Sequence, residues 1–315
     1  MKSFDQKIAA VAAKQYNVID RADVLRAGGT DHHIAVRLRS KRWQQLHPGV
    51  YLIGAAPATW EQRVFAAGRA CGGAAFATGA TGLALYGVDG IERSGEIQVA
   101  VTQSDRPSPK GVRVFRSRRR LVGKRVIDGI PRASVERCLL DFAAFANEFD
   151  VECAVESALD QHLTAERRIW ECLTKQGGRG VPGSARLRRV MASRPRGLPA
   201  KSVLEIEVGH MLRRHGLGSF VRNCPVLDGK YKVDAAFVDE KVAIEADSRR
   251  FHSTRTQRAN DRRRQEEIEK AGWQFERVTF EDVHLDPVGT IARIRSALGA
   301  GAIDPTIVLR RSTTA

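Results

Sequence analysis

The clearest alternation of apolar and polar residues lies in two short segments near the C-terminal end of the chain. Residues 230–238 and 241–247 each follow the two-residue period of a β-strand, and Asp239-Glu240 lies between them. An antiparallel hairpin whose turn is centred on this pair places Asp234 directly opposite Glu245. The other face of the hairpin is apolar and can pack on a core. We therefore expect one buried face and one wet face.

Two acids directly opposite each other on one sheet face repel and destabilise the pair. A cation between the carboxylates of Asp234 and Glu245 would remove that cost, and oxygen ligands suit Mg²⁺ or Mn²⁺. The same register places Lys232 opposite Asp247, one step along the face. A one-residue bulge would reverse the two faces, and a hairpin with ordinary surface acids is the alternative. The sequence thus predicts metal ligands at Asp234 and Glu245, with Asp247 as a third candidate.

Helix signals flank this hairpin. Ser202-x-x-Glu205 is the pattern of a capping box, and periodicity alone does not decide whether Glu205 only caps the helix or also reaches the acids. Residues 256–271 are expected to form a helix closed by Gly272. A strand over 273–279 and a last helix starting at Asp286-Pro287 follow. His252, just past the acidic strand, is either structural or an acid–base residue.

In this order the residues resemble the PD-(D/E)XK nuclease superfamily, and in particular its very-short-patch-repair (Vsr) branch. The resemblance covers roughly residues 200–300 and rests on Ser202-x-x-Glu205, Asp234, Glu245-Ala246-Asp247-Ser248, Phe251-His252, Asp261-Arg262-Arg263-Arg264 and Gly272-Trp273. The chain departs from the pattern at Asp247, where the superfamily has lysine, and at Ser248, where the branch has glycine. The resemblance implies an α/β nuclease fold and Mg²⁺-dependent phosphodiester hydrolysis. It implies these site residues: Glu205, Asp234, Glu245, Asp247 and His252. The hairpin register adds Lys232, as the side chain that could take over the role of the missing lysine.

The N-terminal residues 1–55 show the pattern of a winged helix-turn-helix. An amphipathic helix begins at Phe4, Asp20 caps a short second helix, and Thr30 caps a third helix expected over Asp31 to Trp43. A wing-like strand follows at residues 48–53. A basic third helix suits the major groove of DNA, and our candidates for DNA contacts are His33, Arg37, Arg39, Lys41 and Arg42.

The segment Leu46-x-Pro48-Gly49-Val50-Tyr51 resembles the N-terminal domain of AbiEi-type antitoxins. The resemblance implies a DNA-binding regulator with a toxin partner. The alternative is a winged helix that serves protein contacts instead.

The middle of the chain, residues 56–180, is expected to be a mixed α/β domain. Helical patterns cover 60–86 and 151–174, and strand patterns cover 96–101 and 112–115, with a proline-rich turn between the strands. A basic cluster follows that either grips phosphate or is solvated, and it includes Arg116, Arg118 and Arg119. Residues 181–200 are expected to form a basic hinge before the nuclease-like domain, 201–300, and residues 301–315 a tail. The predicted fold class is an α/β multidomain protein.

Charge is distributed unevenly along the 315 residues, whose formal net charge is +16. Residues 1–200 hold 32 basic and 19 acidic side chains, a net charge of +13, whereas residues 201–300 hold 18 and 16, a net charge of +2. A polyanion, first of all nucleic acid, is the expected partner. No apolar run reaches membrane-spanning length and no signal peptide is expected. The 5 cysteines form no Cys-x-x-Cys pair, so we expect neither zinc nor disulfides, and a reducing cytoplasm fits.

The sequence favours a DNA-binding, metal-dependent endonuclease. A non-catalytic DNA-binding regulator, of the antitoxin kind, is the competing class, and RNA cleavage by the same site is a third. A homodimer and a toxin partner stay open.

The charge distribution predicts that DNA affinity resides mainly before residue 200. Binding should depend strongly on salt, because log K falls by about 0.9 for each neutralised phosphate. Titrations of residues 1–195 and of residues 196–315 with DNA at several salt concentrations test this. The prediction fails if the C-terminal fragment alone reproduces the affinity and the salt slope of the whole chain.

Overall fold

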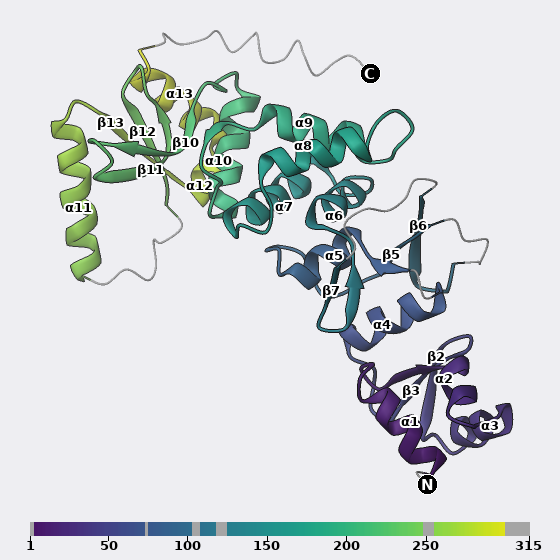
Figure 1. The fold of residues 1–315 in the computed structure, drawn as a ribbon. Coiled ribbons are helices and arrows are strands. Elements are labelled where there is room, and N and C mark those ends of the chain that lie inside the picture. Colours follow the sequence, from purple (N-terminus) through teal and green to yellow (C-terminus); the bar gives the residue numbers. More distant parts are fainter. Residues whose placement is uncertain (1–2, 73–74, 103–107, 118–124, 248–254, 300–315) are drawn as a thin grey trace. The chain divides into compact units, whose positions relative to one another are not determined.

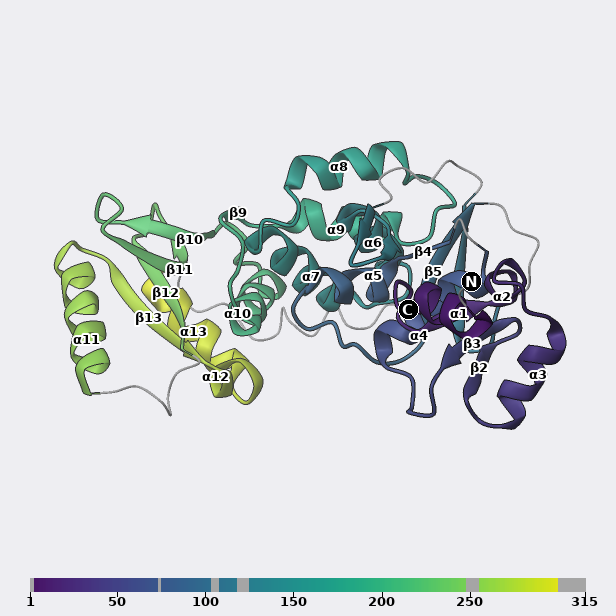
Figure 2. The same ribbon diagram turned by 60° about the horizontal axis from the view of Figure 1, so that its bottom comes forward.

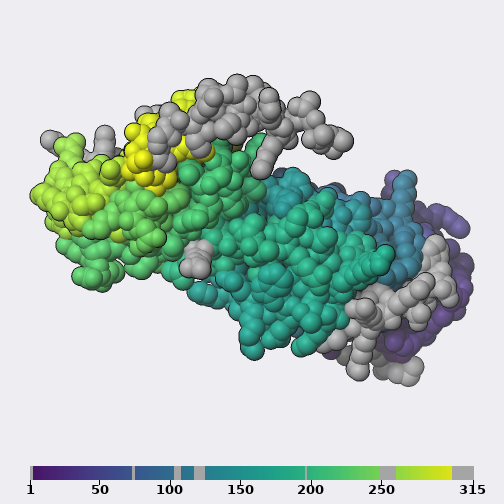
Figure 3. Space-filling view, turned by 90° about the horizontal axis from the view of Figure 1, so that it is seen from above, coloured from purple at the N-terminus to yellow at the C-terminus, as the bar shows by residue number. Residues whose placement is uncertain are grey.

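The computed structural model describes residues 3–72, 75–102, 108–117, 125–247 and 255–299. The chain divides into two units, residues 1–192 and 193–315. In the ribbon view (Figure 1) and the space-filling view (Figure 3), the first unit runs from purple to teal and the second from green to yellow.

The N-terminal part of the first unit is a small helical domain with a three-stranded sheet. Its described elements are α1 (Phe4–Ala12), β1 (Val18–Asp20), α2 (Arg21–Arg26), α3 (Asp31–Arg39), β2 (Trp43–His47) and β3 (Val50–Ile53). Capping boxes begin all three helices, at Ser3, Asp20 and Thr30. The sheet has the order β1-β3-β2, with antiparallel neighbours. The three predicted helices and the strand after Gly49 are present, whereas the sequence pattern did not predict β1 and β2.

The third helix is shorter than its sequence pattern predicts. The expected helix ran to Trp43, but α3 ends at Arg39 and Trp43 begins β2. Lys41 has a φ of +56°, in the left-handed region that interrupts a right-handed helix. Lys41 and Arg42 therefore lie on an exposed turn rather than on a helix face.

Arg37 does not face outwards, as the helical pattern suggested. Its guanidinium group lies 4.7 Å from the centre of the Phe4 ring and 5.4 Å from that of Trp43. It also pairs with Asp5 of α1, and the Arg37 side chain is only 13% exposed. Arg37 thus ties α3 to α1 inside the domain, and the prediction of an outward position for it is wrong.

A second sheet and its helices occupy the middle of the first unit. The elements are α4 (Trp60–Ala70), β4 (Phe76–Ala77), α5 (Gly79–Tyr86), β5 (Ile97–Thr102), β6 (Val112–Ser117), β7 (Arg125–Ile127) and β8 (Ile130–Arg132), with the strand order β6-β5-β4-β8-β7. The single helix expected over 60–86 is interrupted by β4. The two predicted strands are present as β5 and β6, but they pair in parallel, so they are not a hairpin.

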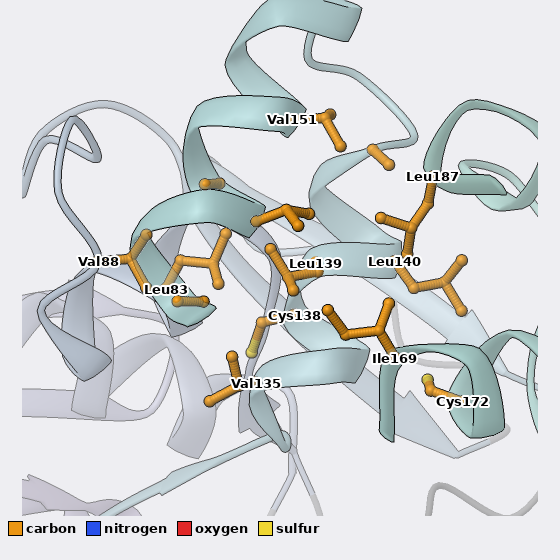
Figure 4. Packing of buried hydrophobic residues seen from close by; sticks show 14 of the residues in the cluster. Leu83, Val88, Val135, Cys138, Leu139, Leu140, Val151, Ile169, Cys172 and Leu187 are labelled. Atoms are coloured by element: carbon orange, nitrogen blue, oxygen red, sulfur yellow. The ribbon is translucent and has the colours of Figure 1, made fainter. Parts of the chain in front are cut away.

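Among the described residues, four more helices complete the first unit: α6 (Val135–Phe142), α7 (Glu148–Asp160), α8 (Glu166–Lys175) and α9 (Ser184–Ser193). The helix expected over 151–174 is therefore two helices. Figure 4 shows their shared core, in which Leu139, Leu140 and Ile169 are fully buried. Leu187 of α9 lies in the same core. The helix inside the expected hinge is thus a packed part of the first unit.

The second unit is built on one mixed sheet. Its elements are β9 (Arg196–Gly197), α10 (Val203–Arg214), β10 (Val221–Val226), β11 (Tyr231–Phe237), β12 (Val242–Asp247), α11 (Arg255–Lys270), β13 (Gln274–Thr279), α12 (Phe280–His284) and α13 (Pro287–Ala297). The strand order is β13-β12-β11-β10-β9. Strands β10, β11 and β12 are antiparallel neighbours, and β13 and β9 pair in parallel at the two sides. The sequence predicted α10, the β11–β12 hairpin, α11, β13 and α13 at these places.

Helices cover both faces of this sheet (Figures 1 and 2). On one face α10 and α13 pack against the strands in a core that contains Leu204, Leu212, Phe237, Val242, Ile244, Ile291 and Ile294. On the other face Ile268 of α11 packs with Ala236 and Ala243. The expected wet face, which carries Glu245, is therefore covered by α11. Within the described part of the chain, no helix is long and apolar enough to cross a membrane.

The environment of Arg37 predicts a stability defect rather than a pure binding defect. Arg37→Ala should lower the free energy of unfolding by about 1–2 kcal/mol, because it removes a half-buried ion pair and two ring contacts. Arg39→Ala, on the exposed face of the same helix, should change it by less than about 0.5 kcal/mol. Urea unfolding of the two variants measures both changes, and equal midpoints would contradict the assignment of Arg37 to the core.

Candidate active site

Asp234 and Glu245 lie across from each other on β11 and β12. The ladder pairs Phe237 with Val242 and Ala235 with Ile244, which is the predicted register, and one further step along both strands reaches the two acids. An oxygen of Asp234, Oδ2, accepts a hydrogen bond from the backbone N–H of Ala246 at 2.9 Å. The hairpin thus fixes the Asp234 carboxylate at the side of Glu245.

Among the described acids of this sheet, Glu245 has the pKa that is shifted most from its usual value. Its side chain is 16% exposed. Burial, followed by the neighbouring Asp234 carboxylate, raises the pKa of Glu245 to about 7, and Arg264 of α11 opposes the shift. Nη2 of Arg264 donates to Glu245 Oε1 and to the backbone carbonyl of Lys232. A cation from a helix, which sequence patterning did not assign, thus sits at the acid pair.

Glu205 joins the same group of acids from α10. Ser202 is the N-cap of α10, and its hydroxyl oxygen accepts from the backbone N–H of Glu205. The Glu205 carboxylate accepts from the N–H of Lys201 at 2.9 Å through Oε2 and from the Ser202 hydroxyl at 3.1 Å through Oε1. Burial, and to a lesser extent the Asp234 carboxylate, raise the pKa of Glu205. The predicted N-cap at Ser202 is therefore present, but Glu205 accepts from the Lys201 N–H rather than from the Ser202 N–H that a capping box uses, and it interacts electrostatically with Asp234.

Asn223 of β10 is a site residue that sequence reasoning missed. Its amide nitrogen donates to the carbonyl of Pro199 at 2.7 Å and to Glu205 Oε2 at 3.4 Å. Its side chain is buried, and its φ of +45° lies in the left-handed region that asparagine tolerates better than most residues. The β10–β11 ladder skips the pair Asn223 and Asp234. The sequence could not predict these contacts, because a single asparagine in a strand does not indicate which residues it will bind. They follow from the positions of Pro199 and Glu205 in the structure.

Three predicted site residues, Asp247, Lys232 and His252, have no described contact with Asp234 or Glu245. Asp247 forms an ion pair with Arg277 of β13 at 3.4 Å. The Lys232 side chain is exposed, and the described β11–β12 ladder ends at Ala235, before Lys232 and Asp247. His252 lies outside the described residues. The structure thus brings Glu205, Asp234 and Glu245 together and leaves the expected contact of Lys232 with Asp247 as a prediction.

The candidate DNA contacts of the first unit differ in exposure. His33 is half-buried, with its ring 5.0 Å from that of Phe4 and its Nδ1 2.9 Å from the Thr30 hydroxyl. Arg39, Lys41 and Arg42 are exposed. Arg116 donates to the Ser108 hydroxyl at 3.3 Å, and Arg118 and Arg119 lie outside the described residues.

A metal ion at this site would rely on few protein ligands. Across the residues that the structure describes, no group of three or more histidine, cysteine or acidic side chains is arranged to hold a metal ion. The chemistry of the Asp234–Glu245 pair nevertheless fits a cation, because two hard oxygen donors repel each other there. Mg²⁺ in particular is usually held by one or two carboxylates and completes its shell with water and substrate phosphates.

The segment that contains this site matches a family of nuclease-type domains. Residues 204–298 match the restriction endonuclease-like family model REase_MTES_1575. The matched segment runs from α10 to α13 and contains Glu205, Asp234 and Glu245. A crystal structure of the RV2827C protein from Mycobacterium tuberculosis aligns with 61% of this chain and 77% of its own, at 17% identity and a TM-score of 0.42. No curated protein matches the chain.

The raised pKa of Glu245 predicts how the stability of the metal-free protein depends on pH. Because the pKa is about 7 in the folded state and 4.5 for an ordinary glutamate, the folded protein holds more protons than the unfolded chain between these values. Stability should therefore fall as pH rises through that window. In EDTA, the melting temperature of the wild type should decrease from about pH 5 to about pH 8 by more than that of Glu245→Gln.

A matched control is Glu240→Gln, which makes the same change at an exposed residue of the hairpin turn. It should keep the wild-type pH dependence. Identical pH profiles for the wild type and Glu245→Gln would show that this carboxyl group does not titrate as described.

Proposed function

We propose that the chain is a DNA endonuclease of the PD-(D/E)XK class, close to the Vsr branch, which uses Mg²⁺ or Mn²⁺ to hydrolyse phosphodiester bonds. One observation carries the proposal. Asp234 of β11 lies beside Glu245 of β12 within the segment that matches the restriction endonuclease-like model, and its charge raises the pKa of Glu245 and of Glu205 on α10. A purely structural sheet has no need of such a cluster, since like charges in contact lower stability.

The residues present fit a divalent ion held chiefly by Asp234 and Glu245. Such an ion would lower the pKa of a bound water and offset charge on the reacting phosphate. Asp234 is oriented for this role by the backbone N–H of Ala246. Glu205 is held by the backbone N–H of Lys201 and by Asn223, so it can complete the ligand set or orient a water molecule. We assign Asp247 to a second ion or to the contact with Lys232, and His252 to acid–base work near neutral pH.

The first unit is proposed to deliver this site to DNA. Its N-terminal elements follow the order of a winged helix, and their net positive charge suits phosphate contacts. The exposed residues Arg39, Lys41 and Arg42 are the best-placed candidates. His33 stays a candidate from the half-buried edge of α3. The Arg116, Arg118 and Arg119 cluster would add further contacts to the backbone.

A non-catalytic regulator is the second candidate function. The ion pair between Arg264 and Glu245 favours it, because a guanidinium group already offsets part of the charge that a metal would neutralise. In that case the nuclease-type domain would serve binding only, and the basic first unit would act as a repressor or an antitoxin with a toxin partner.

Nuclease assays on plasmid, single-stranded and mismatched DNA, with Mg²⁺, Mn²⁺ or EDTA, separate the two functions. We expect cleavage with a divalent ion and none in EDTA. Asp234→Asn and Glu245→Gln should each reduce it by at least about 100-fold, because each removes a ligand needed to stabilise the transition state. Both variants should keep DNA affinity, since most of the positive charge lies in the first unit.

Asp239→Asn, an acid-to-amide change in the exposed turn of the same hairpin, is the control and should cleave like the wild type. Mg²⁺ should also raise the melting temperature of the wild type and not that of Asp234→Asn. A wild type that cuts no form of DNA and gains no stability from Mg²⁺ or Mn²⁺ would rule out the catalytic function in favour of the regulator.

A further inference from the structure

Arg264 is the cation that the described structure brings to the acid pair. It lies on α11, one turn before Ile268, whose fully buried side chain packs on the sheet. Its neighbours Arg262 and Arg263 are exposed, whereas Arg264 is half-buried against β11 and β12. Among the arginines of α11 whose side chains are described, the position of the helix on the sheet therefore brings Arg264 to the site.

Two further contacts hold α11 at this place. The Glu267 carboxylate, one turn along the helix from Arg264, accepts from the Tyr231 hydroxyl at 2.9 Å and pairs with Lys230. Gln265 accepts from Arg277 of β13 at 3.3 Å. These anchors on β11 and β13 fix the helix on either side of Glu245, so the approach of Arg264 does not depend on the ion pair alone.

The Arg264 guanidinium group uses only part of its hydrogen-bonding capacity. Nη2 makes both contacts, to Glu245 Oε1 and to the Lys232 carbonyl. Within the described part of the chain, Nη1 and Nε of Arg264 make no hydrogen bond. The side chain is 29% exposed, so those donors can reach a ligand from solvent. A guanidinium group binds phosphate oxygens through two parallel N–H donors better than an ammonium group does.

A divalent ion that binds the Glu245 carboxylate would weaken the ion pair between Glu245 and Arg264. A metal ion at Asp234 and Glu245 would offset the repulsion that Arg264 partly offsets in the structure described here, and it would compete for Glu245. The released guanidinium group would then lie beside the phosphate that the ion binds. Cleavage of a phosphodiester builds negative charge on the phosphate oxygens, and a positioned arginine stabilises such charge.

We propose that Arg264 is the phosphate-binding cation of this site, which holds Glu245 in the metal-free protein and turns to the scissile phosphate when a divalent ion takes over that carboxylate. The proposal rests on the proposed function and assigns a phosphate contact to a residue of α11. It makes two separate predictions, one for metal binding without DNA and one for cleavage.

The experiment compares the full-length wild type with Arg264→Ala, Arg264→Lys and Arg262→Ala. Without DNA, Arg264→Ala should melt at a lower temperature in EDTA and should gain a larger shift from Mg²⁺ than the wild type, because the ion no longer competes with the guanidinium group. Arg262→Ala removes the same charge from an exposed position of the same helix and should behave like the wild type. A shift in Arg264→Ala equal to or smaller than that of the wild type would overturn the exchange at Glu245.

With DNA and Mg²⁺, Arg264→Ala should cleave at least about 100-fold more slowly than the wild type, the loss typical of removing a donor to transition-state charge. Arg264→Lys should fold like the wild type and recover part of the rate, because it keeps the charge but not the paired donors. If the wild type cleaves and Arg264→Ala stays within twofold of it, Arg264 does not bind the phosphate and the proposed function stands. A wild type that cleaves no DNA defeats the proposed function, and the Mg²⁺ shifts alone then decide the exchange.

Discussion

The site depends on one electrostatic constraint, the opposition of Asp234 and Glu245 across β11 and β12. The two residues lie one step beyond the Ala235–Ile244 pair of the ladder, and the Asp234 carboxylate disfavours the charged form of Glu245. The neighbouring groups offset part of that repulsion. A backbone N–H holds Asp234, a guanidinium group holds Glu245, and burial raises the pKa of Glu245 to about 7. A cation bound to this acid pair would remove the repulsion, and the proposed metal site rests on this.

The supporting elements position the acids through contacts that also stabilise the fold. Glu205 accepts hydrogen bonds from Lys201 and Ser202 at the start of α10 while it lies within electrostatic reach of Asp234. Helix α11 buries Ile268 on the sheet while it presents Arg264 to Glu245. A single substitution at the site therefore affects both stability and chemistry. A variant of a site residue must therefore be measured for its stability without metal as well as for its cleavage rate.

The sequence predicts the register of β11 and β12 correctly as far as the Ala235–Ile244 pair. A turn centred on Asp239-Glu240 fixes that register. The two-residue period breaks at Asp234, because Val233 packs in the cluster of Ala236 and Ile268 and not in that of Ala235 and Phe237. The helix caps at Ser202 and Asp286 and the Gly272 end of α11 follow from equally local signals. The cover of α11 over the acid face was not predicted, because it depends on how a separate helix packs on the sheet. Arg264 was therefore named only within the Asp261-Arg262-Arg263-Arg264 segment of the nuclease resemblance, without a role, and Asn223 was not named at all.

The errors in the first unit have the same origin. Helical periodicity placed Arg37 outside, but the neighbouring rings of Phe4 and Trp43 and the acid Asp5 draw it inside. Helical periodicity also predicted that α3 continues to Trp43. Trp43 is buried, but it is the first residue of β2. Small apolar residues favoured one helix over 60–86, where the structure inserts β4. In each case a tertiary contact outweighs a local preference.

The central claim is that the opposed acids form one divalent-ion site, and counting bound ions tests it most directly. Titration of Mn²⁺ into the metal-free protein, with free Mn²⁺ measured by electron paramagnetic resonance, gives the number of sites and their affinity. The account predicts a saturable Mn²⁺ site in the wild type that is lost in Asp234→Asn and kept in Asp239→Asn. Equal Mn²⁺ binding by the wild type and Asp234→Asn would contradict it.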